Sequence, residues 1–265
     1  MLADVEPKCG GKRLKAHINS GTVARPLITI ITPLFNGCKS LEASILSVLR
    51  QNLDCIEYLF VDGGSTDGSV DMLRKYEESI DYWVSEPDHG IYDAMNKGVQ
   101  LATGRWLCFL GSDDTLCDTL ATAANYLHDD RTIYYGNVFK TGKQQIYDGA
   151  FGAWKLSRRN ICQQAIFYPR SLFEFHEFDL HYQLLADWEL NLRSYSDPRF
   201  KFQFIPLTIA NYNDTTGKSS VACIDPQFRR DHGRILRECL PAPCYLWYQL
   251  IEIVRPALAP FRRRK

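Results

Sequence analysis

Carboxylates at the ends of apolar segments are the first residues in this chain that could do chemistry. The segment 59–61 is followed directly by Asp62, and the segment 106–110 is followed after two residues by Asp113 and Asp114. In an open α/β sheet, the carboxyl ends of the strands form the crevice where ligands bind. Carboxylate oxygens collected there suit a hard divalent cation and a phosphorylated substrate. The sequence therefore predicts an enzyme that handles a nucleotide.

The pair Asp113 and Asp114 could divide this work, with one carboxylate on a metal ion and the other on ribose or a metal-bound water. Such a metal would act as a Lewis acid on a diphosphate leaving group. A structural alternative exists, because Ser112 and Asp113 are also good N-caps for a helix expected after Leu116. The position directly after an apolar strand favours the ligand-binding interpretation.

Asp62 precedes a turn of two glycines, a serine, a threonine and Asp67. A carboxylate at a strand end can accept a hydrogen bond from a nucleotide base, and a glycine such as Gly64 lets the backbone approach a ligand closely. The alternative is an ordinary β–α turn with a helix cap. We interpret Asp62 as the functional residue and Asp67 as a cap.

The segment 86–98 places polar groups, Gly90 and Asn96 among them, around the amino end of a predicted helix, where phosphate binds favourably. Lys97 could add positive charge to that site or lie on a solvated helix face, and the sequence does not separate these two interpretations. Asp187 stands beside aromatic and apolar residues, so it could be desolvated and take a proton from a hydroxyl. Spacing alone favours the polar side of an amphipathic helix for Asp187.

The elements that must position these residues alternate between strand and helix. Residues 27–33 are apolar and β-branched, as in a strand buried on both faces, and residues 40–52 carry apolar side chains at helical spacing. Alternating elements joined by short connections imply an α/β fold, with a mostly parallel sheet sandwiched by helices. The strands are expected at 27–33, 56–61, 82–84, 106–110, 133–138, 145–151, 167–168 and 202–212, and the helices at 40–52, 69–76, 91–102, 116–127, 184–195 and 225–238.

Composition limits the function classes. Lys plus Arg and Asp plus Glu number 31 each, which argues against a nucleic-acid partner because such proteins normally carry a basic excess. None of the nine cysteines is in CxxC spacing, so a zinc site is not expected and a reducing cytoplasm is the simplest location. Residues 1–26 lack an apolar signal-peptide core.

We therefore expect three regions: a flexible extension over residues 1–26, a catalytic domain over 27–220, and a helical segment over 221–265. The last region contains an apolar and aromatic stretch, 245–256, that is too interrupted to span a membrane. It ends in the basic residues 262–265. It could lie on an anionic membrane surface, or pack on the catalytic domain or on another subunit.

In order and spacing, the motifs of this chain over residues 27–220 resemble the inverting family 2 glycosyltransferases with the GT-A fold. The likeness is greatest to bacterial members that build exopolysaccharide, lipopolysaccharide O-chains or colanic-acid-type repeats. The matching segments are 30–36, 44–51, 60–68, 86–98, 101–104, 111–114, 164–168, 178–179 and 186–190.

The resemblance implies transfer of a sugar from a UDP- or GDP-sugar to a hydroxyl of a glycan or of a polyprenyl-diphosphate-linked acceptor, with Mn²⁺ or Mg²⁺ as cofactor. It implies that Asp114 binds the metal ion and that Asp187 is the catalytic base. The nucleotide sugar would be held by Thr32, Pro33, Phe35, Asp62, Gly64, Gly90, Asn96, Lys97 and Asp113.

The chain departs from the family pattern at two positions. Gly63 follows Asp62 where many relatives have a second aspartate, and Gln163 stands where a histidine is frequent. The segment 211–220 resembles a loop that closes over the donor, and its Thr-Gly-Lys-Ser is not a P-loop because the upstream glycine is missing. The remaining alternatives are a sugar-nucleotide pyrophosphorylase, disfavoured by the residues after the first strand, and a non-catalytic scaffold with the same fold.

Overall fold

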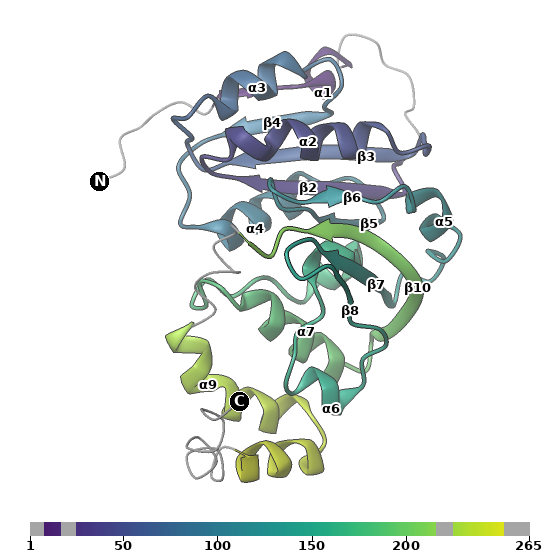
Figure 1. Cartoon of the computed structure of the whole chain (residues 1–265), viewed down its shortest axis with the longest axis vertical. Helices are drawn as coiled ribbons and strands as arrows, with labels where there is room; N and C mark the ends of the chain where they lie inside the picture. The colour runs from purple at the N-terminus through teal and green to yellow at the C-terminus, as the bar shows by residue number, and fades with distance from the viewer. Residues whose placement is uncertain (1–7, 17–24, 216–224, 252–265) are drawn as a thin grey trace.

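The computed structural model describes residues 8–16, 25–215 and 225–251, which form helices packed on a single mixed sheet (Figure 1). The strands are β1 (Lys8–Gly10), β2 (Ile28–Leu34), β3 (Ile56–Asp62), β4 (Tyr82–Ser85), β5 (Trp106–Phe109), β6 (Thr115–Leu116), β7 (Thr132–Lys140), β8 (Gln145–Tyr147), β9 (Ile166–Pro169) and β10 (Lys201–Tyr212). The helices are α1 (Lys12–Ala16), α2 (Cys38–Leu49), α3 (Ser69–Lys75), α4 (Ile91–Leu101), α5 (Leu120–Ala124), α6 (Ala153–Leu156), α7 (Ala186–Ser196) and α9 (Pro226–Cys239), with 3₁₀ turns η1 (Gln163–Ala165) and η2 (Arg170–Glu174). Residues 242–251 are also helical.

The sheet has the order β1-β4-β3-β2-β5-β9-β7-β10-β6, with β8 paired to β7. Strands β4, β3, β2 and β5 are parallel neighbours, whereas β9 runs antiparallel to both β5 and β7. From β2 the chain moves to β3 on one side and later returns to β5 on the other. The strand order therefore reverses between β2 and β5, which is the position where open α/β sheets bind ligands.

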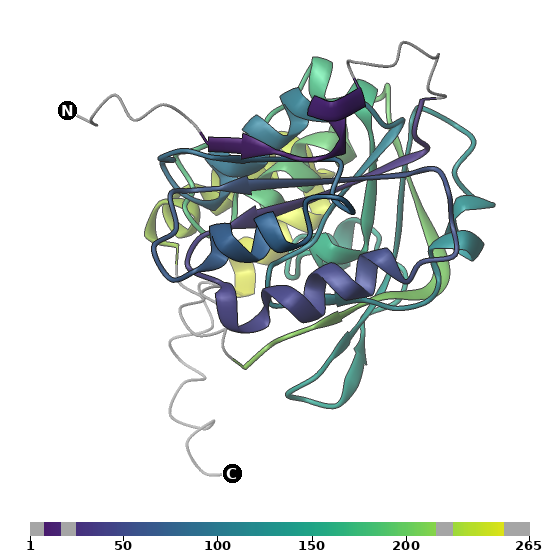
Figure 2. The ribbon, with the colours of Figure 1, turned by 90° about the horizontal axis from the view of Figure 1, so that it is seen from above.

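Apolar side chains cover both faces of the sheet. In β5, Trp106 and Cys108 pack with α2, α3 and α5, whereas Leu107 and Phe109 pack with α4, α7 and α9. This alternation follows from the two-residue period of a strand. Seen from above, α2 lies on one side of the strands and α1 on the other (Figure 2). The two helical layers fix the strand ends, and therefore the loops that follow them.

Three local expectations were wrong. Residues 8–16 are not an extension: β1 pairs with β4 at the edge of the sheet, and Arg13 of α1 forms an ion pair with Glu57. No helix starts near Leu116, because Leu116 pairs with Ala210 as part of β6, and α5 begins only at Leu120. The strand expected at 145–151 ends at Tyr147.

The C-terminal segment is helical where it is described, as expected, since α9 and residues 242–251 follow the sheet. The basic residues 262–265 and the second half of the loop 211–220, residues 216–220, lie outside the described residues. Among the helices that the structure describes, none has the length and apolar character needed to span a membrane.

Candidate active site

Asp187 lies in the first turn of α7, where the helix dipole favours a carboxylate. Its Oδ1 accepts a hydrogen bond of 2.8 Å from the Tyr92 hydroxyl of α4, and its Oδ2 accepts one of 2.6 Å from Asn160 Nδ2. Burial raises the pKa of Asp187 to about 6, although both of these hydrogen bonds oppose the shift. A carboxylate with this pKa is ionised at neutral pH and still basic enough to accept a proton.

Asp114 follows β5 and is only 2% exposed. Its oxygens accept hydrogen bonds of 2.7 Å from Gln164 Nε2 and of 2.8 Å from the Asn213 backbone N–H. Burial raises the pKa of Asp114 to about 7, and the negative charge of Asp113 adds to the rise. Burial also raises the pKa of Asp113. Both carboxylates turn toward Gly111, where an added Cβ would lie 2.6 Å from Asp114 Oδ2 and 3.2 Å from Asp113 Oδ1.

These two carboxylates fit a divalent cation. The hydrogen bonds that most strongly lower the pKa of Asp114 come from Asn213 and Gln164, which are neutral donors, so the protein leaves this negative charge uncompensated. A cation that accepts oxygen ligands would supply the missing charge. Among the described residues, no group of three His, Cys, Asp or Glu side chains is placed to hold a metal. The remaining ligands would therefore have to come from bound substrate or water.

The segment 160–164 joins Asp187 and Asp114. Asn160 donates to Asp187, and Gln164, four residues later, donates to Asp114. Between them lies Cys162, whose pKa is raised to about 12, mainly by burial and further by the charges of Asp114 and Asp187. The structure therefore brings Asp113, Asp114 and Asp187 into one neighbourhood around this segment.

Asp62 is the last residue of β3 and is fully buried. Its Oδ2 accepts hydrogen bonds of 3.1 Å from the Gly64 N–H, 2.9 Å from the Ser65 N–H and 2.6 Å from the Ser85 hydroxyl. Its Oδ1 accepts from the Ser65 hydroxyl. Asp62 therefore shapes the loop after β3, in which Gly64 has a φ of 86°.

Asn36 links this loop to the other loops at the same sheet edge. Its N–H donates to Ser65 Oγ at 2.7 Å, and its side chain accepts from the Thr66 N–H at 2.9 Å. The next residue, Gly37, packs so closely on Ser112 that an added Cβ would lie 2.8 Å from the Ser112 hydroxyl. The loops after β2, β3 and β5 are therefore in contact, which connects Asp62 to the carboxylates after β5.

Gly63, which directly follows Asp62, leaves room for Asp88. The Asp88 carboxylate packs directly on the Gly63 Cα, where a side chain would collide with it. Burial raises the pKa of Asp88, and its Oδ1 accepts a hydrogen bond of 2.9 Å from the Gly90 N–H. A carboxylate is therefore present beside Asp62 after all, but it comes from the loop after β4.

The remaining predicted binding residues have different surroundings. Thr32 and Pro33 are buried within β2, whereas Phe35 is 55% exposed at its end. Asn96 uses its amide to hold the backbone of Phe178, with hydrogen bonds of 2.9 and 3.0 Å. Gly90 has a φ of 117°, and no atom lies within 4 Å of an added Cβ.

Lys97 and Asp67 stabilise local structure. Lys97 Nζ lies 2.9 Å from Glu86 in the loop before α4 and 3.5 Å from Asp93 in the first turn of α4, so its charge is shared between that loop and its own helix. Asp67 accepts hydrogen bonds from the backbone N–H groups of Ser69 and Cys38, the first residues of α3 and α2. Asp67 therefore binds the first residues of both helices, but the N-cap positions themselves are Gly68 and Gly37.

Sequence reasoning missed the neutral donors that surround Asp187. Asn160 lies between elements, and neither its residue type nor its spacing distinguishes it from an ordinary loop asparagine. Tyr92 lies in the motif before α4, but its helical position indicates only that it faces the core. Asn160 lies 27 positions from Asp187 in the chain, and Tyr92 lies 95 positions from it. Only the tertiary structure therefore reveals these contacts.

Comparison with known proteins extends this picture. Residues 29–173 match the family described as Glycosyl transferase family 2. A protein of Mycobacterium bovis BCG named PGL/p-HBAD biosynthesis glycosyltransferase is 39% identical over 215 residues, which cover 78% of this chain and 84% of the relative. Bacillus subtilis TuaG, described as a putative teichuronic acid biosynthesis glycosyltransferase, is 40% identical over 93 residues, 34% of this chain and 37% of the relative.

Solved structures share the fold at low sequence identity. The mannosyltransferase PcManGT from Pyrobaculum calidifontis, in complex with GDP-Man and Mn²⁺, has a TM-score of 0.63 and 20% identity, covering 88% of this chain and 72% of that one. Staphylococcus aureus TarS residues 1–349, in complex with UDP-GlcNAc, has a TM-score of 0.64 and 16% identity, covering 79% of this chain and 65% of that one. This chain spans 39% of the longer TarS structure. The fold is thus the GT-A fold, and together with the family match and the 39% identical relative it shows that this chain belongs to glycosyltransferase family 2.

Proposed function

We propose that this glycosyltransferase moves a hexosyl group from a UDP- or GDP-sugar to a hydroxyl of a glycan or lipid-linked glycan, with inversion at the anomeric carbon. The observation that carries the proposal is the position of Asp187. It is a carboxylate with a pKa of about 6, held by neutral donors and joined through residues 160–164 to the carboxylate pair after β5.

In the proposed reaction, the acceptor hydroxyl oxygen forms a bond to the anomeric carbon while the bond from that carbon to the diphosphate oxygen breaks. Asp187 takes the hydroxyl proton, and the nucleoside diphosphate leaves with the bonding electrons. A single displacement of this kind inverts the configuration. Much of the rate comes from holding the two substrates in line, which here depends on the contacts that fix α7, such as the hydrogen bond from the Tyr168 hydroxyl of β9 to Asn191.

Asp114 would hold Mn²⁺ or Mg²⁺ in this proposal, and Asp113 beside it would contact the nucleotide sugar. When bound, the cation would neutralise charge on the diphosphate of the donor. This assignment is supported by the uncompensated negative charge of the pair. It is also supported by PcManGT, which has the same fold and whose structure is a complex with GDP-Man and Mn²⁺.

The acceptor class is inferred from the names of the relatives. Two of them are named for PGL/p-HBAD biosynthesis and teichuronic acid biosynthesis, and they are 39% and 40% identical to this chain over the matched regions. We therefore propose that the acceptor is a precursor of a bacterial surface glycolipid or polysaccharide, carried on a lipid such as a polyprenyl diphosphate.

The test is a panel of UDP- and GDP-sugars assayed with purified protein and Mn²⁺ or Mg²⁺. At least one donor should raise the melting temperature in a metal-dependent manner and should be hydrolysed slowly without acceptor. The Asp187→Asn variant should keep the donor-induced shift and lose transfer. Asp118→Asn, an exposed carboxylate replaced in the same way, is the control and should retain transfer. Wild-type turnover by Asp187→Asn would remove Asp187 from the role of base.

We further propose that the enzyme works at the cytoplasmic surface of the membrane. The apolar patch formed by Trp154, Leu246, Trp247 and Leu250 is exposed, and the rings of the two tryptophans lie 6.2 Å apart. The sequence after this patch contains Arg255 and the basic residues 262–265. Tryptophan and basic residues together favour an interface with anionic lipid, where a lipid-linked acceptor would be found.

A further inference from the structure

We propose that Asn160 is a positioning residue for Asp187, held in place by Asn191 and Tyr168, and that these three side chains fix the orientation of the carboxylate that accepts the proton. This inference rests on the proposed function, because it assigns a role relative to the base of that reaction. It adds three residues for which neither the sequence motifs nor the comparisons give a role.

A continuous chain of hydrogen bonds carries the proposal. The Tyr168 hydroxyl donates to Asn191 Oδ1 at 2.9 Å, Asn191 Nδ2 donates to Asn160 Oδ1 at 2.8 Å, and Asn160 Nδ2 donates to Asp187 Oδ2 at 2.6 Å. The residues come from β9, α7 and the segment before η1, so the chain ties three parts of the fold to one carboxylate. Asn191 and Tyr168 are both 0% exposed, so water does not compete for the hydrogen bond between them, whereas Asn160 and Asp187 are half-buried.

The donor-to-acceptor direction of this series of hydrogen bonds follows from its buried end, the Tyr168 hydroxyl. Burial raises the pKa of Tyr168 well above its ordinary value, so its hydroxyl keeps its proton and can donate. Asn191 then offers its oxygen to Tyr168 and its NH₂ group to Asn160. Asn160 must in turn direct its own NH₂ group at Asp187, since its oxygen is already used. Every donor therefore points toward the carboxylate, which favours its ionised form.

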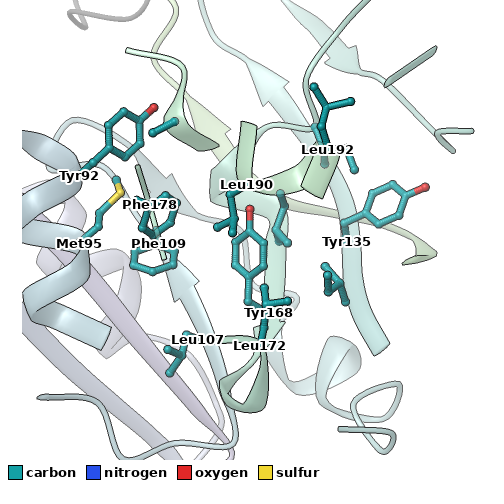
Figure 3. Close-up of a cluster of buried hydrophobic side chains, with 14 of the residues drawn as sticks. Tyr92, Met95, Leu107, Phe109, Tyr135, Tyr168, Leu172, Phe178, Leu190 and Leu192 are labelled. Atoms are coloured by element: carbon teal, nitrogen blue, oxygen red, sulfur yellow. The ribbon is translucent and has the colours of Figure 1, made fainter. Parts of the chain in front are cut away.

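The second oxygen of Asp187 is held from the opposite side. The Tyr92 hydroxyl lies 2.8 Å from Asp187 Oδ1 and also 2.8 Å from the Leu184 carbonyl oxygen, so its single proton is shared between two acceptors. Figure 3 shows Tyr92 and Tyr168 in the same apolar cluster, with both hydroxyls directed to the same side of it. With one side-chain donor on each oxygen, the carboxylate plane is fixed, and Asn160 is the side-chain donor whose proton is not shared.

The titratable groups that face Asp187 are Tyr92 from α4, Tyr168 from β9 and Cys162 from the segment 160–164. Burial raises the pKa of all three, so they are neutral at the pH of the reaction. The contacts that lower the pKa of Asp187 are also neutral donors: Tyr92, Asn160 and backbone N–H groups. Removal of the Asn160 donor should therefore act directly on the basicity of Asp187.

The test compares pH profiles of transfer by the wild-type enzyme and Asn160→Ala. Loss of a hydrogen bond to a charged group disfavours the ionised form, so the acidic limb of kcat should move to higher pH by about one unit. At pH 7 kcat should fall about 10-fold or more because the carboxylate is also less well oriented, whereas KM for the donor should stay unchanged. Tyr168→Phe, which keeps the ring and removes only the hydroxyl, should move the limb in the same direction by a smaller amount.

A purely structural role predicts a different result: a lower melting temperature, with the limb unmoved in both variants. Asn125→Ala, an exposed asparagine at the end of α5, is the control and should change neither quantity. An active wild-type enzyme whose acidic limb is unchanged in Asn160→Ala and Tyr168→Phe would overturn the positioning role. An inactive wild-type enzyme with every donor and acceptor would instead overturn the proposed function.

Discussion

The aspartates of this protein differ in basicity because their surroundings differ. Asp197, at the end of α7, has a pKa far below its ordinary range because the Arg199 guanidinium hydrogen-bonds to it. Asp114 is buried and Asp187 is half-buried, neither has such a partner, and the pKa values of Asp187 and Asp114 are raised to about 6 and about 7. A strong ion pair would stabilise the fold but would remove the basicity that proton transfer needs.

We expect transfer to follow the ionisation of Asp187. The base must be deprotonated, and burial raises its pKa to about 6. Activity should therefore be constant near pH 7 and should fall tenfold per pH unit well below pH 6, because only the ionised fraction reacts. The measurement is kcat/KM for the acceptor between pH 5 and 8 at saturating donor. If the acidic limb of this pH profile had its midpoint near the ordinary pKa of aspartate, burial would not set the basicity of Asp187.

Asp62 is expected to contribute to stability as well as to binding. Asp62→Ala would leave the donors of Ser85, Ser65 and Gly64 without their acceptor in a buried loop. We expect a loss of about 2–4 kcal/mol in the free energy of unfolding, measured by urea denaturation. Asp71→Ala, which removes only the exposed partner of Arg74, should cause no measurable loss. Equal stability of the two variants would contradict the structural role of Asp62.

At the scale of elements, α1 and β1 complete an edge of the sheet. Arg13 donates to the Leu101 carbonyl oxygen at 2.9 Å and lies 5.6 Å from the Tyr82 ring centroid. It also pairs with Glu57, a buried carboxylate that accepts hydrogen bonds from Thr29 and Thr103. Burial acts to raise the pKa of Glu57, but these hydrogen bonds and the charge of Arg13 outweigh it, and the pKa is lowered. The stabilisation from Glu57 is therefore present at neutral pH and is lost only in acid.

One arginine variant and one lysine variant of α1 distinguish the stability contributed by a buried ion pair from that contributed by an exposed one. Arg13→Ala leaves the Glu57 charge without its cationic partner and should lower the free energy of unfolding by about 1–3 kcal/mol. Lys15→Ala removes the exposed pair with Glu78 and should change stability little. Urea unfolding at pH 7 measures both, and donor KM should not change in either. If the Lys15 variant lost as much stability as the Arg13 variant, the burial of Glu57 could not explain the loss in the Arg13 variant.

At the scale of the whole molecule, the proposed catalytic groups lie at the carboxyl edge of the parallel strands, and the apolar patch lies on α6 and the helix 242–251. The Trp188 indole N–H, one residue after Asp187, donates to the Leu156 carbonyl oxygen of α6 at 2.8 Å. The helix that carries the proposed base therefore packs on one of the two helices that carry the patch. Docking of this patch on a membrane would place the site near lipid-linked substrates.

Membrane binding is tested by cosedimentation with vesicles that contain anionic phospholipid. The full chain should bind, and binding should weaken as salt rises because the basic residues 262–265 act electrostatically. Trp247→Glu should reduce binding several-fold, since it adds a like charge to the lipid-facing patch. Ile146→Glu, at a position 62% exposed on β8, is the control and should bind as the wild type does. Equal binding by the two variants would contradict the proposed patch.

The alternation of strands and helices along the chain and the family were accessible from sequence because they depend on local periodicity and on motif spacing. The apolar segments that predicted β2, β3 and β5 are buried on both faces in the fold. Sequence patterns did not predict the strands that form only because of a long-range contact. The short segment 8–10 is a strand only because β4 presents an open edge, and Thr115–Leu116 is a strand only because β10 lies beside it.

The sequence by itself determined which carboxylates follow strands and therefore share an edge of the sheet, since parallel strands end on the same side. It could not determine the state of those carboxylates, because basicity depends on burial and on donors from distant segments. Tertiary structure alone placed Asn160 and Tyr92 on Asp187 and Gln164 on Asp114. It also brought Asp88 to the position that Gly63 leaves open. Such contacts leave no periodic trace in the chain, because each joins a single polar side chain to a partner that folding brings near.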